Sequence, residues 1–140
     1  MNVKRCTCFV FTWNDIIYTF GGYTGPFERS TLIEYLDTNE KEWKLLDVQL
    51  NRGLEGAILL PTDHNEITIF GGLCNSGPTD SVVTINLEEK SIRSKRKLAE
   101  KRSLYKSFYK KGKVYLLGGD DNFTCEVYDI AKQSSEMVKK

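Results

Sequence analysis

Short apolar segments separated by polar turns fill the chain and predict β-structure from end to end. The segments are rich in β-branched and aromatic residues, and no long stretch repeats its apolar residues at helical spacing. Turn-forming residues stand between the segments, as they do in hairpins. We expect strands at residues 6–12, 16–20, 31–36, 42–46, 56–60, 67–70, 82–87, 91–94, 104–109, 114–117, 124–130 and 135–138. The pattern therefore predicts an all-β fold with almost no helix.

An apolar segment that ends in two glycines occurs three times. The copies are residues 17–22, 67–72 and 114–119, and their doublets begin at Gly21, Gly71 and Gly118, which lie 50 and 47 residues apart. A nearly fixed period of this length indicates a repeat architecture. Glycine reaches backbone angles that other residues avoid and lets neighbouring backbone pack closely, so we expect each doublet to close a strand at a tight turn.

Other residues recur in phase with the doublets. An arginine precedes each doublet by 16, 19 and 16 residues, and these are Arg5, Arg52 and Arg102. The longer turn predicted at residues 61–66 accounts for the longer middle spacing. The third strand of each unit carries an aromatic or β-branched residue, which is Tyr35, Ile85 or Tyr128. Trp43 follows Tyr35 by eight residues, whereas Arg93 and Glu136 hold that place in the later units.

A strand, two glycines, a loop, a tyrosine, a short turn and a tryptophan, repeated at about fifty residues, resemble the kelch repeat. The glycines and the preceding arginine match in all three units, the tyrosine in two and the tryptophan in one. The resemblance covers almost the whole chain and implies an incomplete kelch-type β-propeller of three four-stranded antiparallel blades. It divides the single domain, residues 1–140, into blades at about 1–47, 48–95 and 96–140.

A propeller usually closes with roughly 4–8 blades, so three blades would leave the ring open. The outer flanks of the first and third blades would then expose apolar surface. We expect this surface to be covered by further blades of a longer parent chain, by a second copy of the chain or by a partner, and we favour further blades.

Composition fits one ordinary globular domain. The 140 residues include 20 Lys and Arg and 19 Asp and Glu, and the resulting net charge of +1 does not favour nucleic acid or membrane as a target. The sequence shows no secretory signal and no apolar segment long enough to span a bilayer. We therefore expect an intracellular, cytoplasmic protein whose four cysteines, Cys6, Cys8, Cys74 and Cys125, are reduced.

Candidate catalytic and metal-binding residues are sparse, and we expect no enzyme activity, no cofactor and no metal. Some enzymes with kelch-like blades, the galactose oxidase group, bind copper through two histidines and two tyrosines, but His64 is the single histidine of this chain. Cys6 and Cys8 are closer in sequence than the usual cysteine pairs of zinc sites, and we interpret them as packing residues. Asp120 and Asp121 are adjacent carboxylates without a nucleophile or base to complete a catalytic site.

Positive charge is concentrated in residues 90–113, which carry a net charge of +10. A basic stretch with interleaved aromatic residues is typical of surfaces that contact phosphates, so binding to nucleic acid or an anionic surface is one alternative function. A catalytically inactive relative of kelch-like enzymes is another. We favour an exposed connection between blades, because Tyr105, Phe108 and Tyr109 fall in a predicted strand and are expected to fill the space between blades.

The resemblance implies a non-enzymatic protein-interaction module that acts as a scaffold or adaptor. In kelch propellers the loops after the glycine doublets and the connections between units emerge on one face, which commonly holds the partner. Aromatic residues and arginine are the usual hot spots of such faces. The candidate partner-binding residues are Tyr23, Phe27, Arg29, Arg52, Asn75, Thr79, Arg102, Asp121 and Phe123. Arg52 and Arg102 are equally compatible with a structural role between blades.

Overall fold

The computed structural model describes residues 1–138, which form three four-stranded antiparallel sheets and two small two-stranded ones. Sheet I contains β1 (Phe9–Trp13), β2 (Ile16–Phe20), β5 (Leu32–Asp37) and β6 (Glu42–Gln49). Sheet II contains β7 (Ile58–Asp63), β8 (Glu66–Phe70), β11 (Val82–Asn86) and β12 (Ser91–Ser94). Sheet III contains β13 (Lys106–Lys110), β14 (Lys113–Leu117), β15 (Cys125–Asp129) and β16 (Ser134–Met137).

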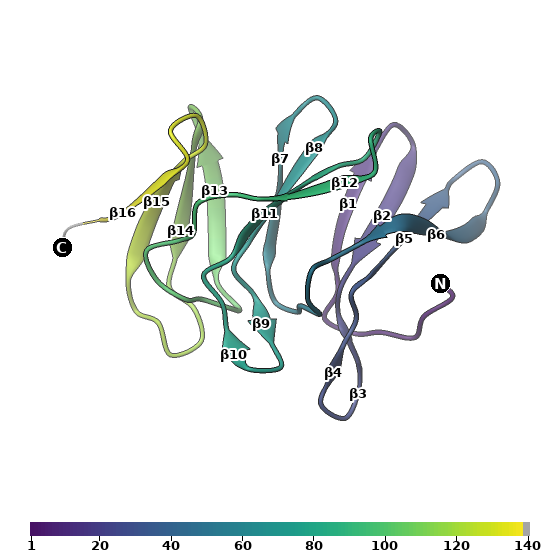
Figure 1. Cartoon of the computed structure of the whole chain (residues 1–140), viewed down its shortest axis with the longest axis horizontal. Coiled ribbons are helices and arrows are strands. Elements are labelled where there is room, and N and C mark those ends of the chain that lie inside the picture. The colour runs from purple at the N-terminus through teal and green to yellow at the C-terminus, as the bar shows by residue number, and fades with distance from the viewer. Residues whose placement is uncertain (139–140) are drawn as a thin grey trace.

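The sheets stand side by side in chain order and do not close into a ring (Figure 1). Strands hold 55% of the residues, and residues 1–138 contain no helix. The predicted all-β class and the four antiparallel strands of each unit are confirmed. Accordingly, the described part of the chain has no helix long and apolar enough to cross a membrane.

Two loops contain strands that the sequence pattern did not predict. Residues 23–30 form the hairpin of β3 (Tyr23–Gly25) and β4 (Glu28–Arg29), and residues 73–79 contain β9 (Leu73–Cys74) and β10 (Gly77–Pro78). The turn predicted at residues 61–66 is present but shorter, because β7 continues through an irregular pairing to Asp63 and the turn is limited to residues 64–65. At the N-terminus, β1 begins only at Phe9, and Cys6 instead pairs with Tyr23.

The first glycine of each doublet has a left-handed backbone, as predicted, with φ of 58°, 55° and 68° at Gly21, Gly71 and Gly118. A Cβ atom at Gly21 would lie 2.2 Å from the carbonyl oxygen of Leu54. The following residue, Gly22, donates its N–H to the same oxygen at 2.7 Å. Gly72 donates in the same way to the Arg102 carbonyl at 2.8 Å, so the first two doublets each join their sheet to the connection that leads to the next sheet.

Two apolar cores separate the three sheets. The fully buried side chains between sheets I and II include Phe20, Ile33, Ile67, Ile69 and Ile85. Those between sheets II and III include Phe70, Val82, Val114 and Leu116. Neighbouring residues of a strand point to opposite faces of a sheet, so β8 supplies Ile69 to one core and Phe70 to the other.

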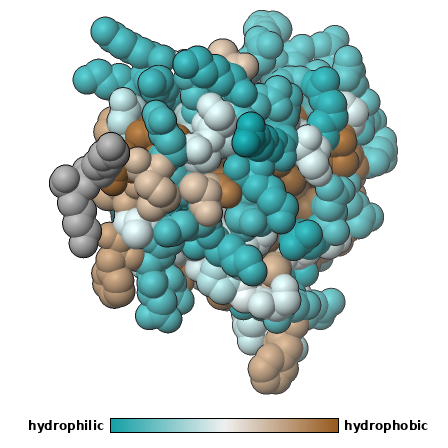
Figure 2. Space-filling view, turned by 60° about the vertical axis from the view of Figure 1, so that its left-hand side comes forward, coloured by the Kyte–Doolittle hydropathy of each residue, from teal (hydrophilic) through white to brown (hydrophobic). Residues whose placement is uncertain are grey.

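No other sheet of residues 1–138 covers the outer face of sheet III, and this face exposes apolar side chains. Phe108 and Leu117 are 45% and 38% exposed, and the Phe108 ring stacks on Tyr115 with the centroids 4.6 Å apart. Figure 2 brings the side of sheet III forward and shows apolar residues exposed among hydrophilic ones. This face corresponds in register to the face of sheet I that packs on sheet II, because Leu117 and Phe20 both directly precede a glycine doublet.

Candidate functional site

The loops that follow the three doublets emerge on one side of the sheets, opposite the hairpin turns of β1–β2, β7–β8 and β13–β14 (Figure 1). The connection between sheets I and II passes beside these loops, and the N–H of Glu55 donates to the carbonyl of Leu73 at 3.0 Å. We call residues 23–30, 50–57, 73–79 and 118–124 the loop side. Predicted binding residues with solvent-exposed surface here are Tyr23, Phe27, Arg29, Arg52, Asn75, Asp121 and Phe123.

Two phenylalanines stand out from the loop side. Phe27, at the tip of the β3–β4 hairpin, is 89% exposed, and Phe123, in the loop after β14, is 91% exposed. Exposing such large apolar rings to water is unfavourable, and burial of one ring is worth about 1.5–3 kcal/mol. Both rings are therefore suited to insertion into a partner's pocket.

A hollow of about 320 Å³ lies between the sheet I–II connection and the β9–β10 hairpin. Its lining consists of Asn51, Arg52, Gly53, Cys74, Asn75 and Ser76, and we call it the Arg52 hollow. A Cβ atom at Gly53 would lie 1.9 Å from the carbonyl oxygen of Arg29, so only glycine lets the connection pass this close to β4. The predicted residues Arg52 and Asn75, distant in sequence, thus line one concave surface.

Arg29 fixes the edge of this hollow rather than projecting freely. Its Nε donates to Glu55 at 2.9 Å, and its Nη1 donates to the Asn75 side-chain oxygen at 3.1 Å. Glu55 also accepts a hydrogen bond of 2.6 Å from the Thr7 hydroxyl. These bonds tie β4, the sheet I–II connection and the β9–β10 hairpin together, and they satisfy both Glu55 carboxylate oxygens.

Cys74 lies inside the Arg52 hollow and was not singled out from the sequence as a site residue. Burial acts to raise the pKa of its thiol, but hydrogen bonds from Ser76 and the hydrogen bond and charge of Arg52 lower that pKa overall. The Sγ atom lies 3.2 Å from the Ser76 hydroxyl and donates to the Gly77 carbonyl at 3.1 Å. The hollow thus holds the positive charge of Arg52 beside the Cys74 thiol.

Two predicted binding residues, Thr79 and Arg102, are buried, with 4% and 0% of their surface exposed. Arg102 donates to the Glu126 carboxylate at 2.9 Å and to the Gly118 carbonyl at 2.8 Å. Within the described chain Arg102 offers no surface to a partner, and its role is structural. Thr79 likewise uses its backbone, in an isolated antiparallel pairing with Arg102.

The arginines of the three units are not in the same structural place, contrary to the pattern of spacing. Arg5 repeats the contacts of Arg102, donating to Glu34 at 2.7 Å and to the Gly21 carbonyl at 2.7 Å. In the middle unit, Leu54 holds the backbone position of Arg102, since its carbonyl accepts the N–H of the preceding sheet's glycine doublet. Val83, paired with Ile69 two residues before the doublet, holds the position of the two glutamates.

A second hollow, of about 430 Å³, lies beside Phe123. It is lined by Pro78, Glu100, Lys101, Asp120, Asp121, Asn122, Phe123 and Thr124. The Glu100 carboxylate accepts hydrogen bonds from Thr124 at 2.6 Å and from Asn122 at 3.1 Å, which hold this loop to the sheet II–III connection. The predicted residues Asp121 and Phe123 thus share this hollow, apart from the Arg52 hollow.

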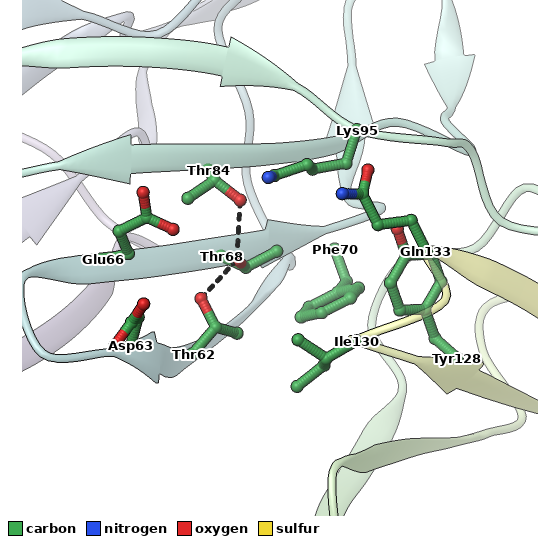
Figure 3. Close-up of a pocket in the computed structure, with 10 residues that line it drawn as sticks. All are labelled: Thr62, Asp63, Glu66, Thr68, Phe70, Thr84, Lys95, Tyr128, Ile130 and Gln133. Carbon is green, nitrogen blue, oxygen red and sulfur yellow. Dashed lines mark hydrogen bonds between the residues drawn. The ribbon is translucent and has the colours of Figure 1, made fainter.

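A smaller pocket of about 130 Å³ lies between sheets II and III, near the end of the sheets that is opposite the loop side (Figure 3). The hydroxyls of Thr62, Thr68 and Thr84 form a chain in which each link is 2.8 Å. Phe70 and Tyr128 close the pocket with their rings 5.3 Å apart. These hydroxyls already have hydrogen-bond partners in one another. We therefore interpret the pocket as the polar end of the core between these sheets and not as a binding site.

The candidate metal ligands are dispersed. Within residues 1–138, no three His, Cys, Asp or Glu side chains are grouped so that they could hold a metal ion. His64 is exposed in the β7–β8 turn, where its ring lies edge-on to Trp13 at 6.4 Å. Cys6 is exposed, Cys8 is half-buried, and all four cysteines are free thiols.

The basic residues of the stretch 90–113 are separated and partly neutralised. Lys90 pairs with Asp47, Arg93 with Glu66, Lys97 with Asp80 and Arg102 with Glu126. Tyr105 packs between sheets II and III, as expected. Phe108 and Tyr109 do not fill the space between the sheets, because they are 45% and 55% exposed.

No protein-family model matches this sequence, and no curated protein matches it.

Proposed function

We propose that the chain is a non-enzymatic protein-interaction module, built from three kelch-type propeller blades, that binds a segment of another protein on its loop side. The observation that carries this proposal is the gathering of Phe27, Phe123 and the Arg52 hollow on the side where the loops after the doublets emerge. Exposed aromatic rings and arginine are the residues that most often dominate binding energy in protein interfaces.

The repeated architecture supports the kelch-type assignment. Each unit is a four-stranded antiparallel meander whose second strand ends in a left-handed glycine doublet. The units join through the same backbone hydrogen bond from the second glycine, and two of them share a buried arginine–glutamate pair. Similar parts in similar positions are what a propeller of repeated blades requires.

The exposed flank of sheet III supports the further proposal that another sheet covers it. Phe108, Tyr115 and Leu117 occupy the face that, in the two preceding sheets, packs on the next sheet. Light scattering of the purified chain tests this proposal: we expect self-association that the change Phe108→Ser with Leu117→Ser reduces. A monomer whose behaviour these changes leave unaltered would contradict it.

Selection of randomised displayed peptides on the immobilised chain tests the proposed function. We expect selected peptides to bind the purified chain and to lose about tenfold or more in affinity with Phe27→Ala or Phe123→Ala, since truncating a hot-spot ring costs about 2 kcal/mol. His64→Ala, on the opposite side, is the matched control and should leave the affinity unchanged.

Two results would refute the proposal. One is a set of peptides whose affinity depends on His64 but on neither phenylalanine. The other is a chain that binds duplex nucleic acid with a steep salt dependence and binds no peptide, which would favour the basic stretch 90–113 instead.

A further inference from the structure

We propose that the Arg52 hollow is a carboxylate-binding site that takes the side chain of an aspartate or glutamate in the partner segment. This inference rests on the proposed function and adds the chemistry of the ligand. The Arg52 side chain is exposed and lines the concave surface, where Asn51, Asn75 and Ser76 also present polar side chains.

Within the described residues, no acidic side chain pairs with the charge of Arg52. Four of the five other arginines of residues 1–138 form ion pairs, which are Arg5–Glu34, Arg29–Glu55, Arg93–Glu66 and Arg102–Glu126; the fifth, Arg96, lines neither this hollow nor the one beside Phe123. Arg52 takes part in no ion pair within this part of the chain. A guanidinium that lines a hollow without an acidic neighbour favours an anionic ligand, and its planar pair of N–H donors matches a carboxylate.

Glu55, the acidic residue nearest in sequence to Arg52, is held by other groups. One of its carboxylate oxygens accepts from Arg29 and the other from Thr7, at 2.9 and 2.6 Å. These bonds keep the carboxylate on the β4 side of the connection, and Glu55 does not line the Arg52 hollow. Because Arg29 and Thr7 hold Glu55 in this position, Glu55 does not neutralise the positive charge of Arg52.

Packing between the sheets does not account for Arg52. The structural place that arginine fills in the first and third units is filled by Leu54, which is 2% exposed. Arg52 lies two residues earlier and lines the hollow together with Cys74. The guanidinium lies beside the Cys74 sulfur, and its positive charge remains available to an anionic ligand in the hollow.

A titration with a single carboxylate tests the inference without any partner. The probe is the capped tripeptide Gly-Glu-Gly, with Gly-Gln-Gly as the isosteric neutral control, and the readout is the NMR signal of the Arg52 guanidinium N–H groups, assigned through Arg52→Lys. We expect the acidic peptide to shift the Arg52 signal and the neutral peptide not to. Equal shifts with both peptides, or shifts of all exposed arginines alike, would overturn the inference.

Peptides obtained by display selection then separate this inference from the proposed function. We expect them to contain an acidic residue and to lose about tenfold or more in affinity with Arg52→Ala, as loss of a charged hydrogen bond predicts. Lys110→Gln, which removes an exposed charge at the opposite side, is the control and should change nothing. Peptides that depend on Phe27 or Phe123 but not on Arg52 would overturn the carboxylate site and leave the proposed function standing. Unchanged urea midpoints of the variants exclude unfolding as the cause.

Discussion

The guanidinium of Arg102 and the carboxylate of Glu126 lie 2.9 Å apart, and neither side chain has any exposed surface. The first unit repeats the pair with Arg5 and Glu34. Each arginine also donates to the carbonyl of the first glycine in its doublet. The pair therefore fixes the doublet relative to the third strand of the same sheet. The loops of the loop side that follow these doublets start from this fixed point.

Breaking this pair is expected to destabilise the chain strongly. Glu126→Gln leaves the Arg102 charge buried without a counter-charge, and the free energy of unfolding should fall by about 3–5 kcal/mol. Glu40→Gln, in an exposed pair with Lys44, is the matched control and should cost less than about 1 kcal/mol. Urea unfolding measures both, and equal costs for the two variants would contradict a structural role for the buried pair.

The middle unit allows the pair to be rebuilt. Leu54→Arg or Val83→Glu alone places one unpaired charge in a buried position and should cost several kcal/mol. Together they recreate the arrangement of the other units, so the double variant should be more stable than the sum of the single costs predicts, by about 2 kcal/mol or more. Additive costs in this double-mutant cycle would show that Leu54 and Val83 are not the structural equivalents of Arg102 and Glu126.

Gly21 and Gly25 should respond differently to alanine. Gly21 has φ of 58°, and an added Cβ would meet the Leu54 carbonyl oxygen at 2.2 Å. A left-handed alanine alone costs about 1–2 kcal/mol, and the clash adds to this. Nothing lies within 4 Å of a Cβ added at Gly25, so Gly25→Ala should be neutral or slightly stabilising. Thermal unfolding compares the two, and similar melting temperatures would contradict the close packing of the first doublet.

Alkaline pH should destabilise the chain through Tyr105. Burial raises the pKa of this tyrosine far above its ordinary value of 10.0, although the Arg102 charge partly offsets the effect. Above about pH 10 the unfolded chain therefore loses the phenolic proton while the folded chain keeps it, and the free energy of unfolding falls by about 1.4 kcal/mol per pH unit. Tyr105→Phe should flatten this fall between pH 10 and 11, whereas Tyr109→Phe, at an exposed ring, should not. Identical pH slopes for the wild type and Tyr105→Phe would contradict it.

The doublets and the strands before them could be predicted because glycine is the residue that both the left-handed angle and the close backbone approach require. The structural position of the middle arginine, Arg52, could not be predicted from its spacing. Two residues more separate Arg52 from β7 than separate Arg5 from β1, and the irregular pairing at Pro61 adds one more. Spacing along a chain does not show whether extra residues lie in a loop, a turn or a bulge.

The strand register also shows that Tyr35 and Tyr128, which the sequence pattern placed in equivalent positions of the third strands, are not equivalent. Tyr35 pairs with Tyr18, three residues before the first doublet, whereas Tyr128 pairs with Val114, four residues before the third. The two tyrosines therefore lie on opposite faces of their sheets, because a shift of one residue reverses the face. Loops of different length hide this shift in the sequence.

The sequence does contain an indication of the glutamates that pair with arginine. Glu34 stands between Ile33 and Tyr35, and Glu126 stands between Cys125 and Val127, so each is a charged residue within an apolar strand. A charge at such a place requires a partner, and the arginines before the doublets are the available cations. The Arg52 hollow could not be found this way, because it depends on how the sheet I–II connection meets the β9–β10 hairpin.

Mapping the surface that a bound peptide covers distinguishes binding on the loop side, as we propose, from binding elsewhere on the chain. Amide signals of the isotope-labelled chain are followed while a display-selected peptide is added. We expect shifts concentrated on the loop side, at residues 23–30, 50–57, 73–79 and 118–124. Shifts concentrated at the opposite turns, residues 13–16, 62–66 and 110–113, would contradict it.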